Sequence, residues 1–284
     1  MIEYKLELAG CNCSVAEWNP SGKTLVFGLH GWLDNLATFE TLAASMPDVR
    51  LIAVDSPGHG HSAHLEPGRA YYFIDGLFLI DDLIEHFHLD SVNLLGHSMG
   101  GAIATIYAAT QPDRVNKLLL IEALGPVTSP VEESQSALCK ALVQRRALKN
   151  KRKPVYESFE QALAVRAEVS EIQPDLIKPL VERALTCVEG GYTWRADSRL
   201  RIPSTLRMSE DQLRSILPSI KAPTLMVEAK SGLLQAANAQ YIQDRKELVK
   251  DLKVHLLPGG HHLHLEYPDE IGRLIQSFLK SEIS

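Results

Sequence analysis

Cysteine is scarce in this chain, and neither sign of charge dominates it. Four cysteines among 284 residues are too few for a disulfide framework, and their spacing fits no metal-binding motif. The 29 basic and 35 acidic residues give a formal net charge of −6, so we expect no nucleic-acid partner. The first ten residues include Glu3, Lys5 and Glu7 and have no apolar core, which is atypical of a signal peptide. We therefore expect a cytoplasmic protein.

A stretch without charged residues, 91–111, is long enough to cross a bilayer. However, Asn93, His97, Ser98 and three glycines interrupt it. A buried strand, a tight turn and a buried helix explain this pattern better, so we expect no contact with a membrane.

Short apolar runs alternate with helical periodicity at both ends of the chain. The pattern predicts strands at 2–8, 14–18, 24–29, 49–54, 92–95, 115–121, 223–227 and 252–257, and helices at 36–46, 76–87, 100–110 and 269–278. Such alternation is typical of an α/β protein whose mostly parallel central sheet has helices on both faces. Residues 126–215 show helical periodicity and no convincing buried strand. We therefore predict a core of 1–125 and 216–284 with a helical lid at 126–215.

The pentapeptide Gly96-His97-Ser98-Met99-Gly100 lies between a predicted strand and a predicted helix. In that setting Gly-x-Ser-x-Gly is a nucleophile elbow, whose tight turn strains the serine backbone and requires small neighbours two positions away. The turn exposes the hydroxyl above a helix N-terminus, which favours developing negative charge. We predict that Ser98 is a catalytic nucleophile.

A second motif, His30-Gly31-Trp32, follows a predicted buried strand. A backbone N–H at such a strand end can face an acyl oxygen bound over Ser98. We predict an oxyanion hole formed by the N–H groups of Trp32 and Met99. The alternative is a plain turn at the strand end, with the Trp32 side chain in the core.

Together these motifs resemble those of the α/β-hydrolase-fold serine hydrolases, and in particular those of the serine hydrolase-like proteins. The matching pieces are His30-Gly31-Trp32, Asp55-x-x-Gly58-x-Gly60-x-Ser62, the elbow, and a late histidine followed by Glu and Pro. The resemblance implies the α/β-hydrolase fold, a lid inserted after the sixth strand, and hydrolysis of an ester or related acyl compound. It implies no particular substrate, because this superfamily is chemically diverse.

Three histidines after Asp55 raise the possibility of a metal site. His59, His61 and His64 have a spacing similar to that of metallo-β-lactamase-like hydrolases. Those enzymes need an aspartate directly before the third histidine, where Ala63 stands. We therefore predict no metal and no other cofactor.

The triad order of this fold, serine then acid then histidine, places the general base late in the chain. The family pattern is Gly-His with Glu five residues and Pro seven residues after the histidine. Gly260-His261 with Glu266 and Pro268 fits that register. We predict that His261 is the base, with His262 as the next candidate.

The sequence differs from the family pattern at the carboxylate residue of the triad. The usual Gly-x-x-Asp motif follows the seventh strand, but Ala229 stands for its Gly and Gly232 for its Asp. We favour Glu122, which ends the sixth strand beside that of Ser98, a placement similar to that in some haloalkane dehalogenases. The alternatives are Glu228 at the end of the seventh strand, a purely structural Glu122, and a Ser–His dyad without an acid.

The inserted segment contains the aromatic and basic motif Tyr192-Thr193-Trp194-Arg195-x-Asp197-x-Arg199. We predict that Trp194 and Arg195 contact the substrate. The alternative is that charged residues of the segment form salt bridges that dock a basic lid on an acidic core.

The sequence thus predicts a serine hydrolase that cleaves a small or medium carboxylic ester through an acyl-enzyme. Two other functions stay open at this stage. One is a C–C bond hydrolase acting on a vinylogous diketone, with Arg195 or Arg199 holding a carboxylate. The other is a non-catalytic ligand receptor on the same fold. The predicted partner is a small-molecule substrate, and the oligomeric state is left open.

Overall fold

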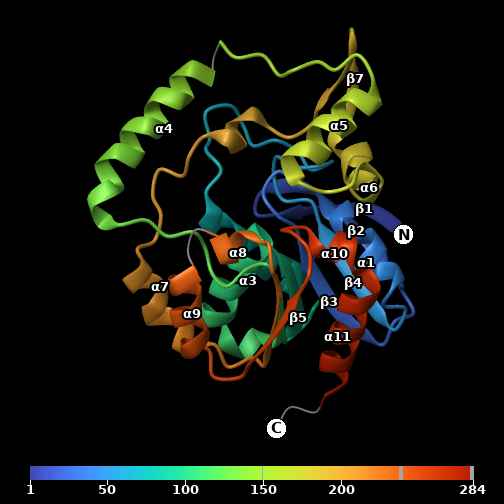
Figure 1. The fold of residues 1–284 in the computed structure, drawn as a ribbon, viewed down its shortest axis with the longest axis vertical. Helices are drawn as coiled ribbons and strands as arrows, with labels where there is room; N and C mark the ends of the chain where they lie inside the picture. Colours follow the sequence, from blue (N-terminus) through green and yellow to red (C-terminus); the bar gives the residue numbers. More distant parts are fainter. Residues whose placement is uncertain (149, 237–238, 282–284) are drawn as a thin grey trace.

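A computed structural model describes residues 1–148, 150–236 and 239–281, which are organised around an eight-stranded sheet (Figure 1). Its strands are β1 (Ile2–Leu8), β2 (Cys11–Trp18), β3 (Thr24–Leu29), β4 (Val49–Val54), β5 (Val92–His97), β6 (Val115–Ile121), β9 (Thr224–Ala229) and β10 (Leu252–Leu257). They lie in the order β1-β2-β4-β3-β5-β6-β9-β10. β2 is antiparallel to both β1 and β4, and all other neighbours are parallel. This confirms the predicted α/β-hydrolase fold with a mostly parallel sheet.

Helices cover both faces of the sheet. Those of the sheet domain are α1 (Glu40–Ala44), α2 (Gly76–His86), α3 (Met99–Thr110), α8 (Leu233–Ala236), α9 (Ala239–Leu248), α10 (Leu263–Glu266) and α11 (Pro268–Lys280). Alternate residues of one strand face opposite layers: Leu118 and Leu120 pack with α2 and α3, whereas Leu119 and Ile121 pack with α1 and α11. Because both faces are buried, the sequences of such strands are continuous runs of apolar residues.

Most predicted elements match the observed ones closely. The strand expected at 14–18 begins earlier, at Cys11 of β2, and two further differences lie near the site. The helix expected at 36–46 begins as a 3-10 turn, Leu36–Phe39, before α1. The Asn35 side chain accepts a hydrogen bond from the Ala37 N–H and so caps that turn. The strand expected at 92–95 continues to His97, so it leads directly into the elbow.

The segment between β6 and β9 contains four α-helices and a hairpin. They are α4 (Ser134–Leu148), α5 (Phe159–Ser170), α6 (Pro174–Ala184), β7 (Leu185–Val188), β8 (Gly191–Trp194) and α7 (Glu210–Ile216). The hairpin corrects the expectation of a purely helical segment. Its strands have only four residues each and are mostly not buried, so they lack the apolar run that marks a buried strand.

The α5–α6 pair packs in a small hydrophobic cluster that includes Leu265 of α10, and ion pairs also join it to the sheet domain. Figure 1 shows the pair near β1 and β2, whereas α4 lies at the other side of the view. Arg183 of α6 binds Asp55 at 2.8 Å and Glu3 at 2.7 Å. Arg166 of α5 binds Asp34 at 2.5 Å. These contacts agree with the alternative in which salt bridges dock the segment.

Within the described ranges, no helix has both the length and the apolar character needed to cross a membrane.

Candidate active site

Parallel strands bring the predicted motifs to one edge of the sheet. Leu29 at the end of β3 pairs with Gly96 of β5, and His97 pairs with Ile121 at the end of β6. Ile121 in turn pairs with Val227 of β9. The loops after these strands therefore meet at the carboxyl edge, where ligands bind in open α/β sheets.

The turn from β5 into α3 has the strained geometry that the elbow motif predicts. Ser98 has φ 51° and ψ −116°, a backbone conformation that is rare for a residue with a side chain. A Cβ on Gly96 would lie 2.4 Å from the backbone of Gly101, and a Cβ on Gly100 would lie 2.0 Å from the Leu29 carbonyl oxygen. Only glycine at both positions allows the close packing that holds Ser98 in place.

Ser98, His261 and Glu122 form a line of side-chain contacts. His261 Nε2 lies 2.9 Å from Ser98 Oγ, and its Nδ1 lies 3.4 Å from Glu122 Oε2. The second distance is longer than an optimal hydrogen bond. With the proton on Nδ1 facing the carboxylate, Nε2 is able to accept the serine proton.

Glu122 is held on both sides by the neighbouring strand. It directly follows β6 with φ 50°, and its N–H donates to the Val227 carbonyl at 2.9 Å. Its Oε1 accepts from the Ala229 N–H at 2.7 Å, which leaves Oε2 toward His261. The carboxylate is thus both bonded to loop backbone and placed at the base.

Glu228, the alternative acid, faces a different partner. Lys246 of α9 lies 2.7 Å from Glu228 Oε1, and both side chains are largely buried. The charge of Glu228 is thus balanced by lysine, whereas that of Glu122 faces the imidazole.

Burial lowers the pKa of His261, and the adjacent Glu122 carboxylate partly opposes this effect. The imidazole is therefore neutral over a wider pH range than an exposed histidine. A neutral ring is the form that can accept a proton from Ser98.

One predicted oxyanion donor belongs to the elbow and the other to the loop after β3. Met99 is the first residue of α3, so its N–H has no carbonyl partner within the helix. Trp32 lies in the loop after β3, beside β5. Its side chain is half exposed, and its indole N–H donates to the Leu200 carbonyl at 3.0 Å. The alternative that placed the Trp32 side chain in the core is therefore wrong.

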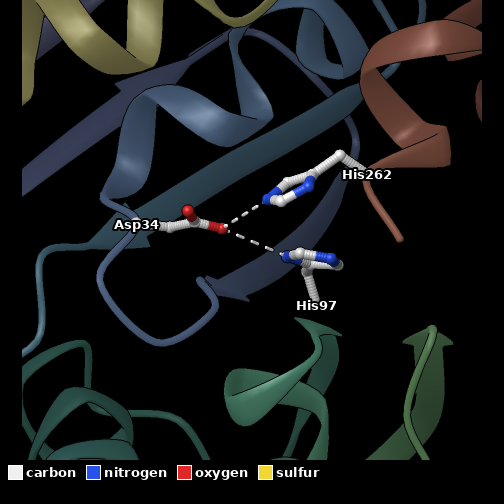
Figure 2. Close-up of side chains that lie close together, drawn as sticks. All are labelled: Asp34, His97 and His262. Carbon is white, nitrogen blue, oxygen red and sulfur yellow. Dashed lines mark ion pairs between the residues drawn. The ribbon is translucent and has the colours of Figure 1, made fainter. Parts of the chain in front are cut away.

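Behind His261 lies a buried cluster that the sequence reasoning missed. Asp34 Oδ2 lies 3.5 Å from His97 Nδ1 and 3.4 Å from His262 Nε2 (Figure 2). His264 packs against His97 with ring centroids 4.3 Å apart, and it bonds the Thr38 hydroxyl. The only sign of this cluster in the sequence was the position of its residues. His97 lies within the elbow motif, and Asp34 lies two residues after the His30-Gly31-Trp32 motif.

This cluster contains the one group of possible metal ligands in the described ranges, since the three ligand atoms lie within 4.8 Å of one another. Arg166 already neutralises Asp34, and His262 Nδ1 has no acceptor that would orient a ligating ring. Asp34 Oδ2 and His97 Nδ1 also have no hydrogen-bond partner, so the cluster is not a fully hydrogen-bonded network. The histidines of the Asp55 segment have separate contacts: His59 with Pro57, His61 with Glu3 and His64 with Arg195.

The two predicted substrate contacts lie within the hairpin region. The Trp194 indole N–H donates to the Tyr156 hydroxyl at 3.1 Å, and the two rings pack edge to face. Arg195 Nε donates to the Leu185 carbonyl at 2.9 Å. These contacts join parts of the inserted segment and do not involve the Ser98 line. A role of Trp194 and Arg195 in substrate binding stays a prediction.

Comparison with known proteins places the chain in one family. Residues 24–268 match the family model of the alpha/beta hydrolase fold. A serine hydrolase-like protein of Danio rerio is 30% identical over 93% of this chain and 84% of its own length. The hypothetical protein PA1622 from Pseudomonas aeruginosa PAO1 is 34% identical with a TM-score of 0.93, covering 99% of this chain and 100% of that one. A thioesterase domain from the curacin biosynthetic pathway is 27% identical with a TM-score of 0.84, covering 97% and 99%. The chain therefore belongs to the α/β-hydrolase family, as a relative of the serine hydrolase-like proteins.

Proposed function

We propose that this α/β-hydrolase cleaves a small or medium carboxylic ester through an acyl-enzyme on Ser98. The observation that carries the proposal is the 2.9 Å contact between Ser98 Oγ and His261 Nε2, with Glu122 behind the ring. A nucleophile, a base and an orienting carboxylate in hydrogen-bond sequence are the requirements of nucleophilic acyl transfer.

In the proposed mechanism Ser98 Oγ attacks the acyl carbon while His261 takes its proton. The N–H groups of Trp32 and Met99 bind the oxygen that becomes negative. His261 then protonates the leaving alcohol, which departs and leaves the acyl-enzyme. Water attacks the same carbon, His261 again acts as base, and the carboxylic acid is released. Glu122 holds the ring in the required tautomer and stabilises its protonated form.

The two other functions have less support. A C–C bond hydrolase would need an arginine to hold a carboxylate, but Arg199 already binds Asp197 at 2.6 Å and Arg195 bonds backbone. A non-catalytic receptor would be favoured by loss of a triad member. Instead the nucleophile, the base and a carboxylate lie together.

Reaction with a fluorophosphonate probe tests the nucleophile directly. We expect wild type to be labelled and Ser98→Ala to remain unlabelled with an unchanged melting temperature. A panel of p-nitrophenyl esters from acetate to dodecanoate then tests the substrate class, and activity should be highest with a short or medium acyl chain. Undiminished ester hydrolysis by Ser98→Ala would end the proposal.

A further inference from the structure

One buried carboxylate contacts the residues next to both the nucleophile and the base. Asp34 Oδ2 faces His97, which directly precedes the nucleophile, and His262, which directly follows the base (Figure 2). Asp34 itself belongs to the loop after β3, where its N–H closes a turn on the Gly31 carbonyl at 3.2 Å. The three loops that carry the proposed catalytic groups therefore converge on this side chain.

His97 extends the connection to the backbone of the base. Its Nε2 lies 2.9 Å from the carbonyl oxygen of His261. A carbonyl oxygen can only accept, so the proton of this bond is on His97 Nε2. The ring also packs against that of His261, with centroids 4.8 Å apart. The imidazole of the base thus contacts Glu122 through its Nδ1 and packs against the ring of His97.

The inserted segment completes the arrangement. Arg166 of α5 binds the other oxygen, Asp34 Oδ1, at 2.5 Å. The next residue, Asn35, donates its amide to the Leu180 carbonyl of α6 at 2.9 Å. Burial alone would raise the pKa of the Asp34 carboxyl, but His262, His97 and Arg166 together hold that pKa well below its usual range. The carboxylate is therefore ionised. Arg166 binds Oδ1, whereas Oδ2 faces the His97 and His262 rings without a hydrogen bond.

We propose that Asp34, His97 and His262 are positioning residues that keep the nucleophile, base and oxyanion loops in one catalytic geometry. Arg166 fixes the carboxylate at their centre. This proposal rests on the proposed hydrolase function. Acyl transfer is sensitive to displacements of about 1 Å, and these loops leave three different strands, so a buried bridge between them affects the rate directly.

Kinetics of Asp34→Asn test the proposal. The variant keeps the shape of the side chain but removes the charge that faces both rings. We expect kcat for a p-nitrophenyl ester to fall about tenfold or more, with KM within about twofold. The matched control is Asp197→Asn, because Asp197 is also a buried aspartate paired with arginine but bonds Tyr71 and Arg199 instead. Its kcat should stay within about twofold of wild type.

A pair of substitutions at His97 separates positioning from packing. Glutamine places an amide N–H near the position of Nε2 and can still donate to the His261 carbonyl, whereas leucine fills the space without a donor. We expect His97→Gln to retain most of kcat and His97→Leu to lose about tenfold. A role in packing alone would give the two variants equal rates at equal melting temperatures.

A measurement on wild type covers the case in which a variant fails to fold. Histidine ¹⁵N NMR should show the His97 proton on Nε2, and a proton on Nδ1 alone would overturn the proposal. So would an unchanged kcat in Asp34→Asn, or equimolar zinc in native protein that is lost from that variant. Absence of fluorophosphonate labelling of wild-type Ser98 would instead refute the proposed function itself.

Discussion

The carboxylate of Glu122 fills the space that a side chain on Gly232 would occupy. A Cβ on Gly232 would lie 2.1 Å from Glu122 Oε2 and 2.4 Å from its carboxyl carbon. Gly232 stands where the resemblance to the family leads us to expect the triad aspartate. The chain thus places a carboxylate near the expected location but supplies it from the sixth strand, and the glycine makes room for it.

The first prediction concerns which carboxylate serves the base. Glu122→Gln should lower kcat by about 10²-fold or more, because the neutral amide no longer stabilises the protonated imidazole. Glu228→Gln should be milder, since Glu228 is paired with Lys246. Steady-state kinetics on one ester check the ranking. The reverse order would make Glu228 the acid, and full rates in both variants would indicate a Ser–His dyad.

A second prediction follows from the shared space of Glu122 and Gly232. Gly232→Asp alone should be damaging, because the new side chain collides with the Glu122 carboxylate. In the Glu122→Ala background the same change should recover at least about tenfold of the lost kcat, because the acid returns to the usual position of the family. Gly232→Asn in that background is the control and should recover nothing. Equal rates for the Asp and Asn versions would contradict the triad assignment.

Substitutions of the histidines that follow β10 should differ sharply in their effect on kcat. His261→Ala should reduce kcat by about 10³-fold or more, because it removes the general base. His262→Ala and His264→Ala should cost much less, since their rings lie behind the base. Melting temperatures of the three variants check that each is folded. If His262→Ala were the inactive variant, the assigned register would be off by one residue.

The pH dependence should reflect the buried base. Burial lowers the His261 pKa from 6.5, so the neutral, active form persists at lower pH and kcat/KM should decline only below pH 6.5. Glu122→Gln removes the opposing carboxylate and should move this acid limb to still lower pH. Profiles with a neutral ester from about pH 4 to pH 9 would show both effects. A limb at or above pH 6.5, or an upward shift in the variant, contradicts the prediction.

Docking of the inserted segment should depend on Arg183. Arg183→Met leaves Asp55 buried without its partner and should destabilise the protein by about 3 kcal/mol in urea unfolding. Lys178→Met, on the same helix, removes only an exposed pair with Glu182 and should change stability by less than about 0.5 kcal/mol. We also expect faster proteolysis near 126 and 215 in Arg183→Met. Equal stabilities of the two variants would show that the ion pair does not dock the segment.

Local sequence patterns were sufficient for most elements of the sheet domain. β1, β3, β4, β6 and β10 have the predicted bounds. β3, β4 and β6 are mostly buried and apolar, as strands covered on both faces must be, whereas β1 and β10 are largely exposed edge strands. The elbow could also be predicted from the sequence. Its glycines are required by close contacts with residues near Ser98 or on the adjacent strand. The hairpin at 185–194 was not, because its short exposed strands carry no periodic signal.

By itself, the sequence determined the order of the eight strands of the sheet and predicted a nucleophile and a narrow choice of base, because those depend on neighbours along the chain. It left open which glutamate meets His261, and it did not reveal the cluster around Asp34. Glu122 and His261 are 139 residues apart, and Arg166 is 132 residues from Asp34. Contacts of that separation depend on strand register and on how helices dock. Only the tertiary structure decided that Glu122 faces the imidazole while Glu228 faces a lysine.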